Sequence, residues 1–178
     1  MLTRVVRFLL GGISAAALWW YGSAAYNELI GWPASWLLHA DPRLFDIESI
    51  ERGRWLLLRS ASGHFPPAII PADQLTYNII LFIALVAAEP RLIRDRKWLL
   101  AAVALVILVA SHIITLAVVT EATYATVEKL LSDRYGALET NLWFGAAMFL
   151  RMVGMLGIAF ICWLMIRLWP TIQRQKRS

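Results

Sequence analysis

Four apolar stretches divide this chain of 178 residues, and their lengths constrain its fold more than any other feature. They cover about residues 5–26, 71–90, 98–119 and 142–169. A helix needs about 20 mostly apolar residues to cross the hydrocarbon core of a bilayer. Charged residues make up only 16% of the chain, whereas soluble domains carry about 25%. The sequence therefore predicts an all-α integral membrane protein, a bundle of four transmembrane helices forming a single membrane domain over residues 1–178.

The first two stretches each allow a second interpretation. Residues 5–26 follow Arg4 and end in aromatic residues, as in a helix anchored by an aromatic belt, but Ser23–Ala25 also resembles a signal-peptide cleavage site. We favour a retained anchor. The apolar core of the second stretch, Leu75–Ala88, is shorter than a bilayer requires. It spans only if residues at both ends of 71–90 extend the helix.

The distribution of basic residues predicts the orientation. Ten of the 17 Lys and Arg residues lie in the N-terminal segment, the 89–97 loop and the tail from Arg167 onward. Because basic residues near helix ends mark the cytoplasmic side, both termini are expected in the cytoplasm. The net charge of +5 does not indicate nucleic-acid binding, since the basic residues flank the apolar stretches.

Two segments are expected on the outer side, where they would form a small extracytoplasmic cap. One is the loop of residues 27–70, in which Leu29–Leu38 predicts a short interfacial helix with Pro33 in its first turn. Two runs within Asp46–Ser60, separated by a Gly-containing turn, favour a β-hairpin; an irregular loop is the alternative. The other segment, residues 120–141, is amphipathic, with Val127, Leu130 and Leu131 on one face.

Two ionisable residues lie inside apolar stretches, which makes them candidate site residues. His112 lies about 21 Å from the cytoplasmic end of its stretch, and Arg151 about 13 Å from the outer end of its own. With Ser111 and Thr115, they can form a polar cluster in the outer leaflet that binds an anionic or carbonyl-bearing group.

A structural interpretation of the two residues also stays open. Arg151 would then reach toward the membrane surface or pair with Glu121, Asp133 or Glu139, and His112 would bond to a backbone carbonyl.

Neither a catalytic set nor a metal site can be assigned from the sequence. Haem ligation by two histidines would need a partner for His112 at matching depth, whereas His39 and His64 lie in the outer loop. Cys162, the single cysteine, lies near the cytoplasmic end of the last stretch, so we expect it to be an inert packing residue. Cofactors remain unassigned.

The order of the segments resembles one known family. The short stretch begins Leu75-Thr76-Tyr77-Asn78 and ends Ala88-Glu89-Pro90, and is followed by an Arg-rich turn, a long apolar stretch and an Arg-bearing last stretch. Over roughly residues 75–169 this is similar to the small multi-span proteins that accompany exosortases, the membrane transpeptidase-like enzymes of some Gram-negative bacteria. The resemblance implies an accessory role and a location in the inner membrane of a bacterium. Exosortases use an outer-facing Cys with Arg and His, whereas Cys162 is expected on the opposite side.

The sequence thus favours a non-enzymatic accessory or assembly subunit of a membrane complex, in contact with the lipid bilayer and with other membrane proteins. Its polar cluster would contact a partner or a lipid-linked group. Two alternatives stay open. One is a subunit that contacts a cofactor, pigment or quinone in an electron-transfer or photosynthetic complex. The other is an intramembrane enzyme that acts on a lipid-linked substrate through His112 and Arg151.

Overall fold

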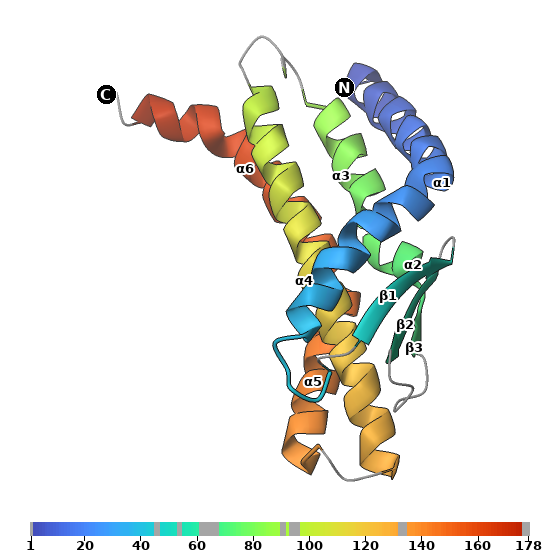
Figure 1. Cartoon of the computed structure of the whole chain (residues 1–178). Helices are drawn as coiled ribbons and strands as arrows, with labels where there is room; N and C mark the ends of the chain where they lie inside the picture. Colours follow the sequence, from blue (N-terminus) through green and yellow to red (C-terminus); the bar gives the residue numbers. More distant parts are fainter. Residues whose placement is uncertain are drawn as a thin grey trace. The chain divides into compact units, whose positions relative to one another are not determined.

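The computed structural model describes residues 2–44, 47–52, 55–60, 68–89, 92, 97–131 and 135–175. Most of them are helical (Figure 1). The helices are α1 (Leu2–Leu38), α2 (Ala72–Thr76), α3 (Asn78–Ala87), α4 (Lys97–Leu131), α5 (Ala137–Phe149) and α6 (Met155–Gln175). A π-helical turn, η1 (Leu150–Gly154), joins α5 to α6, and the strands are β1 (Ile47–Arg52), β2 (Trp55–Ser60) and β3 (Ala68–Ile70).

Three helical segments within the described residues are long and apolar enough to cross a membrane. They are Leu2–Leu38, Lys97–Val127 and Ala137–Trp169. The prediction of a largely helical, multi-pass membrane protein is confirmed at this level. The apolar segment Ala72–Ala87 is shorter than the other three, and Tyr77 separates its two helices, α2 and α3.

The expected separate helix over Leu29–Leu38 is wrong, because α1 continues through this segment without a break. Pro33 lies inside α1, where it cannot donate a backbone hydrogen bond. Ile30, Ala34 and Leu38 recur every four residues and are at most 3% exposed. Burial of this single helical face favours continuation of α1 and offsets the lost bond.

The amphipathic stretch 120–141 is shared between two helices. Residues 120–131 form the C-terminal part of α4, and residues 137–141 begin α5. Val127 is partly buried; the side chains of Leu130 and Leu131 lie outside those described. Helix α4 is therefore longer than the apolar stretch 98–119 that predicted it.

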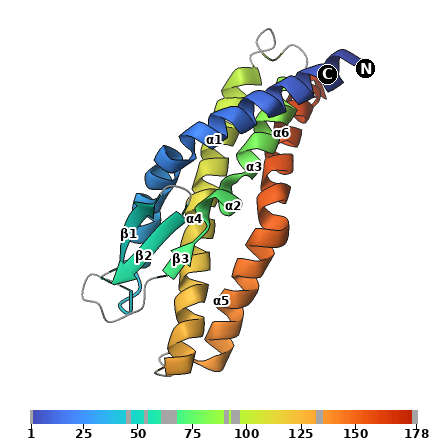
Figure 2. The same ribbon diagram turned by 90° about the vertical axis from the view of Figure 1, so that its right-hand side faces the viewer.

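The chain divides into two compact units. Unit 1 comprises Met1–Tyr21, Tyr77–Ala110 and Leu156–Ser178, and unit 2 comprises Gly22–Thr76 and Ser111–Met155. In unit 1, the N-terminal end of α1, the end of α3, the start of α4 and the end of α6 lie at the same end (Figures 1 and 2). This grouping brings the basic residues Arg4, Arg7, Lys97 and Arg167 to one end of the unit.

The core of unit 1 forms where α3, α4 and α6 meet. Its buried members are Phe82 from α3, Ala104 and Leu108 from α4, and Ala159, Cys162 and Ile166 from α6. Cys162 is a free, buried thiol in this apolar core, the position expected of a packing residue.

Two close contacts join helices of unit 1. Gly11 of α1 lies against α3, and a Cβ atom added there would lie only 2.5 Å from the Cβ of Ala87. The ammonium group of Lys97 lies 2.5 Å from a carboxylate oxygen of Glu89, and both side chains are only 7% exposed. This buried ion pair joins the chain after α3 to the start of α4.

Unit 2 contains a small antiparallel sheet with strand order β1-β2-β3. Arg52 pairs with Trp55 and Ile47 pairs with Ser60, so only residues 53 and 54 separate β1 from β2. The predicted β-hairpin is therefore confirmed. Strand β3 adds to β2 through pairs such as Leu56 with Ile70, and it leads into α2.

Candidate functional site

His112 lies on α4 in unit 2 and is fully buried. Its Nδ1 atom lies 2.6 Å from the hydroxyl oxygen of Tyr26 on α1, and the two rings meet edge to face. Thr115 is also buried, one turn further along α4, whereas Ser111 is partly buried. A buried His–Tyr bond between two helices is typical of polar side chains that stabilise helix packing in membranes.

Arg151 lies in different surroundings from His112. It belongs to η1, it is exposed, and it lines a cavity of about 280 Å³ together with residues of α4 and α5. Neither His112, Ser111 nor Thr115 lines this cavity. The shared pocket predicted for His112 and Arg151 thus has no contact to support it among the described residues.

The carboxylates considered as partners for Arg151 are engaged elsewhere. Glu121 accepts a hydrogen bond of 2.8 Å from the hydroxyl of Tyr135, and Glu139 lies 2.7 Å from Arg43. Asp133 lies outside the described residues. Across the part of the chain that the structure describes, the side chain of Arg151 forms no ion pair or hydrogen bond.

The densest polar cluster surrounds Arg43, just after the end of α1. We call Asp41, Arg43, Glu121, Tyr135 and Glu139 the Arg43 cluster. The guanidinium binds both oxygens of Asp41, with the shortest contact, from Nη2, at 2.6 Å. It also donates to both oxygens of Glu139, at 2.7 and 3.2 Å. Two carboxylates therefore hold the planar guanidinium through paired hydrogen bonds.

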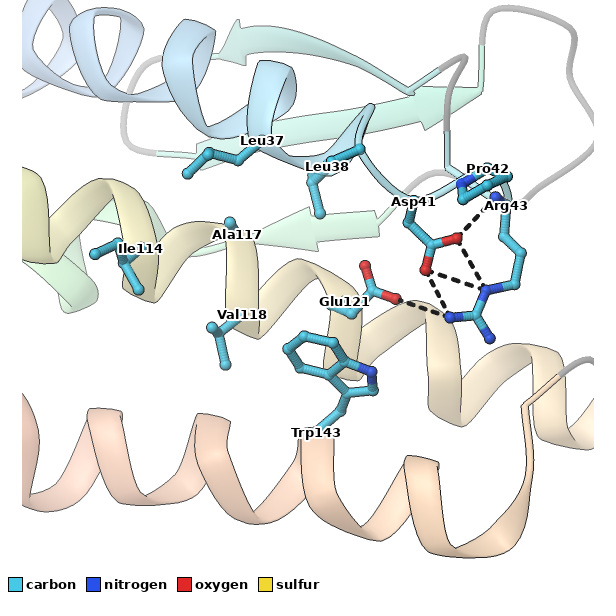
Figure 3. Close-up of a pocket in the computed structure, with 11 residues that line it drawn as sticks. Leu37, Leu38, Asp41, Pro42, Arg43, Ile114, Ala117, Val118, Glu121 and Trp143 are labelled. Carbon is cyan, nitrogen blue, oxygen red and sulfur yellow. Dashed lines mark hydrogen bonds and ion pairs between the residues drawn. The ribbon is translucent and has the colours of Figure 1, made fainter.

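Two further groups complete the Arg43 cluster. The ring of Tyr135 lies 3.9 Å below the guanidinium carbon, a cation–π contact. Glu121 is 5% exposed and lies 3.9 Å from Nη2 of Arg43 (Figure 3). Through these contacts Arg43 connects the chain after α1 with α4, α5 and the segment between them.

The cluster shifts the protonation equilibria of its members. Hydrogen bonds from Arg43 lower the pKa of the Asp41 carboxyl, and the same bonds to Asp41 and Glu139 raise the pKa of Arg43. Burial raises the pKa of the Tyr135 hydroxyl, and its hydrogen bond to Glu121 adds to the increase. Arg43 is thus charged, Asp41 ionised and Tyr135 neutral near pH 7.

A groove of about 670 Å³ lies beside the Arg43 cluster, which we call the Trp143 groove. Its apolar part is lined by Leu37, Leu38, Ile114, Ala117, Val118 and Trp143, and its polar end by Asp41, Arg43 and Glu121 (Figure 3). The volume falls within the range of ligand-binding clefts. The arrangement can receive an elongated apolar group that carries a polar end.

Sequence reasoning missed Arg43, Asp41 and Tyr26. Asp41 and Arg43 lie just after the end of α1, where charged residues are common, and Tyr26 lies within α1. A local signal existed for Asp41 and Arg43, because an Asp two residues before an Arg can accept that residue's backbone N–H, as observed at 2.8 Å. Tyr26 lies 86 positions from His112 and gave no such signal.

Among the described residues, no group of three or more His, Cys, Asp and Glu residues is placed to hold a metal ion. His112 is enclosed by packing, and Arg43 is bound by carboxylates.

Comparisons with known proteins identify no relative. No family model matches the chain, and it matches no curated protein and no solved structure.

Proposed function

We propose that this protein is a non-enzymatic accessory subunit of a membrane complex and that it receives an apolar segment of a partner membrane protein in the Trp143 groove. The observation that carries the proposal is the groove itself, which has an apolar wall and a charged end. The polar groups around it bind one another, so they are suited to holding a shape and presenting a surface. A partner subunit is the occupant that an exposed groove of this kind fits.

The charge at the groove's end indicates what the partner carries. One guanidinium faces the carboxylates of Asp41, Glu121 and Glu139. Two of these carboxylates, Asp41 and Glu121, line the groove beside the single guanidinium, so this end favours a positively charged or hydrogen-bond-donating group. We therefore expect the partner segment to present apolar side chains followed by a Lys or Arg at the membrane surface.

The proposed topology has four spans with both termini in the cytoplasm of a bacterial inner membrane. Helix α4 has 35 residues, about 50 Å at 1.5 Å per residue, so it exceeds a hydrocarbon core of about 30 Å. If Lys97 marks the cytoplasmic boundary, the core ends about 20 residues later, near Ala117. Glu121 then lies in the outer headgroup region, and the sheet with the Arg43 cluster forms the outer cap. Helices α2 and α3 supply the fourth span.

Co-purification tests the proposal. The protein is isolated from its native membranes in a gentle detergent, and bound proteins are identified by mass spectrometry. A membrane enzyme of the exosortase class is the partner to look for first, given the resemblance of residues 75–169. Ala117→Phe fills the groove, and Ala102→Phe places the same ring on an exposed position of α4 as the matched control.

We expect a membrane protein to co-purify with the wild type and with Ala102→Phe, and to be lost from Ala117→Phe at equal protein yield. The proposal is refuted if no membrane protein is enriched with the wild type. It is also refuted if Ala117→Phe retains the partner as well as the control does.

A further inference from the structure

The cavity beside Arg151 lies on a seam between two helices of unit 2. Phe144, Ala147, Met148 and Arg151 follow one another at helical spacing on one side, and Val119, Ala122, Thr123, Thr126 and Val127 do so on the other. Residues three and four apart share a helix face, so two continuous faces meet here. Ala122 and Ala147 are both buried, and their small side chains leave the space of about 280 Å³.

Among the described residues that line this cavity, Arg151 is the single charged one. Two other basic side chains have carboxylate partners. Arg43 binds Asp41 and Glu139, and Lys97 binds Glu89. Within the described residues, Arg151 has no such carboxylate. A guanidinium in a mostly apolar lining is costly in a membrane unless an anion compensates its charge.

The backbone at Arg151 departs from the regular α-helix. Residues Leu150–Gly154 form a π turn, and the backbone N–H of Met155 donates to the carbonyl of Leu150. Such turns are rare and occur frequently at functional sites. Arg151 lies in the first part of this turn and continues the series Phe144, Ala147 and Met148 at regular helical spacing.

From the cavity, the arginine and the π turn together, we propose that the Arg151 cavity binds the phosphate of an anionic phospholipid from the outer leaflet. The guanidinium matches a phosphate group through paired hydrogen bonds. The hydroxyls of Thr123 and Thr126 donate to their own helix carbonyls, so Arg151 is the group that recognises the anion. The lining residues of α4 lie at headgroup level in the proposed topology, where they contact the glycerol and ester groups of the lipid.

The expected depth agrees with this occupant. If Arg167 marks the cytoplasmic boundary of the last span, Arg151 lies 16 residues, or about 24 Å, above it. That places the guanidinium just inside the outer edge of a hydrocarbon core of about 30 Å, where it reaches the lipid phosphates. The site is independent of the Trp143 groove, since the two share no lining residue.

Lipid titration followed by native mass spectrometry tests the proposal on the full chain in detergent. The probes are phosphatidylglycerol and diacylglycerol, which lacks the phosphate. Arg151→Gln should weaken phosphatidylglycerol binding about tenfold, because one charge-assisted interaction is lost, and should leave diacylglycerol binding unchanged. Arg167→Gln, an exposed arginine near the far end of α6, is the matched control and should bind as the wild type does.

Two further measurements keep the test decisive. Arg151→Lys retains the charge and should bind phosphatidylglycerol with intermediate strength, even if Arg151→Gln folds poorly. On the wild type alone, millimolar inorganic phosphate should fail to displace the lipid. Equal binding by Arg151→Gln and the wild type overturns the proposal. Displacement by inorganic phosphate overturns it as well, because the site would then recognise a free anion.

Discussion

At the residue scale, Arg43 is the most connected side chain in the described part of unit 2. It binds two carboxylates, approaches a third and stacks on Tyr135. These contacts link segments far apart in the sequence, since Arg43 and Glu139 are separated by 96 positions. The residue therefore closes unit 2 by joining the end of α1 to the α4–α5 connection.

We expect Arg43→Gln to lower the free energy of unfolding by about 1–2 kcal/mol. A charge-assisted hydrogen bond contributes about 1.5–3 kcal/mol, and solvent screening reduces this for a side chain that is 29% exposed. Arg43→Lys keeps the positive charge but loses the paired hydrogen bonds of the guanidinium. Its free energy of unfolding should therefore be intermediate. Thermal unfolding in detergent measures the effect, with Arg4→Gln on the exposed start of α1 as the control. Equal unfolding temperatures for all variants would contradict the assigned role.

The Asp41 carboxyl predicts a defined pH dependence. Its pKa is lowered in the folded protein, chiefly by hydrogen bonds from Arg43. The stabilisation is therefore present above the ordinary Asp pKa of about 3.9 and is lost as the pH falls through the lowered value. The wild-type unfolding temperature should drop below about pH 4. Asp41→Asn should have a lower unfolding temperature at pH 7 and a smaller decrease below pH 4. Asp73→Asn, the control, should show the same decrease as the wild type.

At the scale of the elements, unit 1 depends on a close approach of α1 to α3. Gly11 leaves no room for a side chain, because an added Cβ would lie 2.5 Å from Ala87. At the neighbouring Gly12, the added Cβ would meet Ala84 at an ordinary contact of 3.5 Å. Gly12 is therefore a control position for a substitution at Gly11.

Gly11→Ala should destabilise unit 1 by about 1–3 kcal/mol, the range for overpacked sites, whereas Gly12→Ala should be neutral or slightly stabilising. Thermal unfolding in detergent distinguishes them. If both variants unfold at the wild-type temperature, α1 does not approach α3 at Gly11 as described.

At the scale of the whole molecule, the topology is testable by site-specific labelling. In a Cys162→Ala background, Ser62→Cys should react with a membrane-impermeant thiol reagent added from outside. Leu92→Cys should react only after the membrane is opened, because α2 and α3 cross to the cytoplasm in the proposed arrangement. External reactivity at both positions would show that α2 and α3 do not span, and reactivity only at Leu92 would reverse the orientation.

Much of the fold could be predicted from the sequence. Long apolar stretches predicted the three long helices, and alternation around a Gly-containing turn predicted the β1–β2 hairpin. The continuation of α1 through Pro33 could not be predicted, because a proline commonly begins a helix and only the buried face of Ile30, Ala34 and Leu38 favours continuity.

The sequence by itself determined that this is a helical membrane protein, and it identified His112 and Arg151 as unusual. Both conclusions follow from hydropathy and charge, which are properties of consecutive residues. Only the tertiary structure decided which groups meet. It paired His112 with Tyr26, placed Arg151 at a separate cavity and assembled the Arg43 cluster. These contacts join residues many positions apart, and such pairs depend on helix packing, which no local pattern of residues encodes.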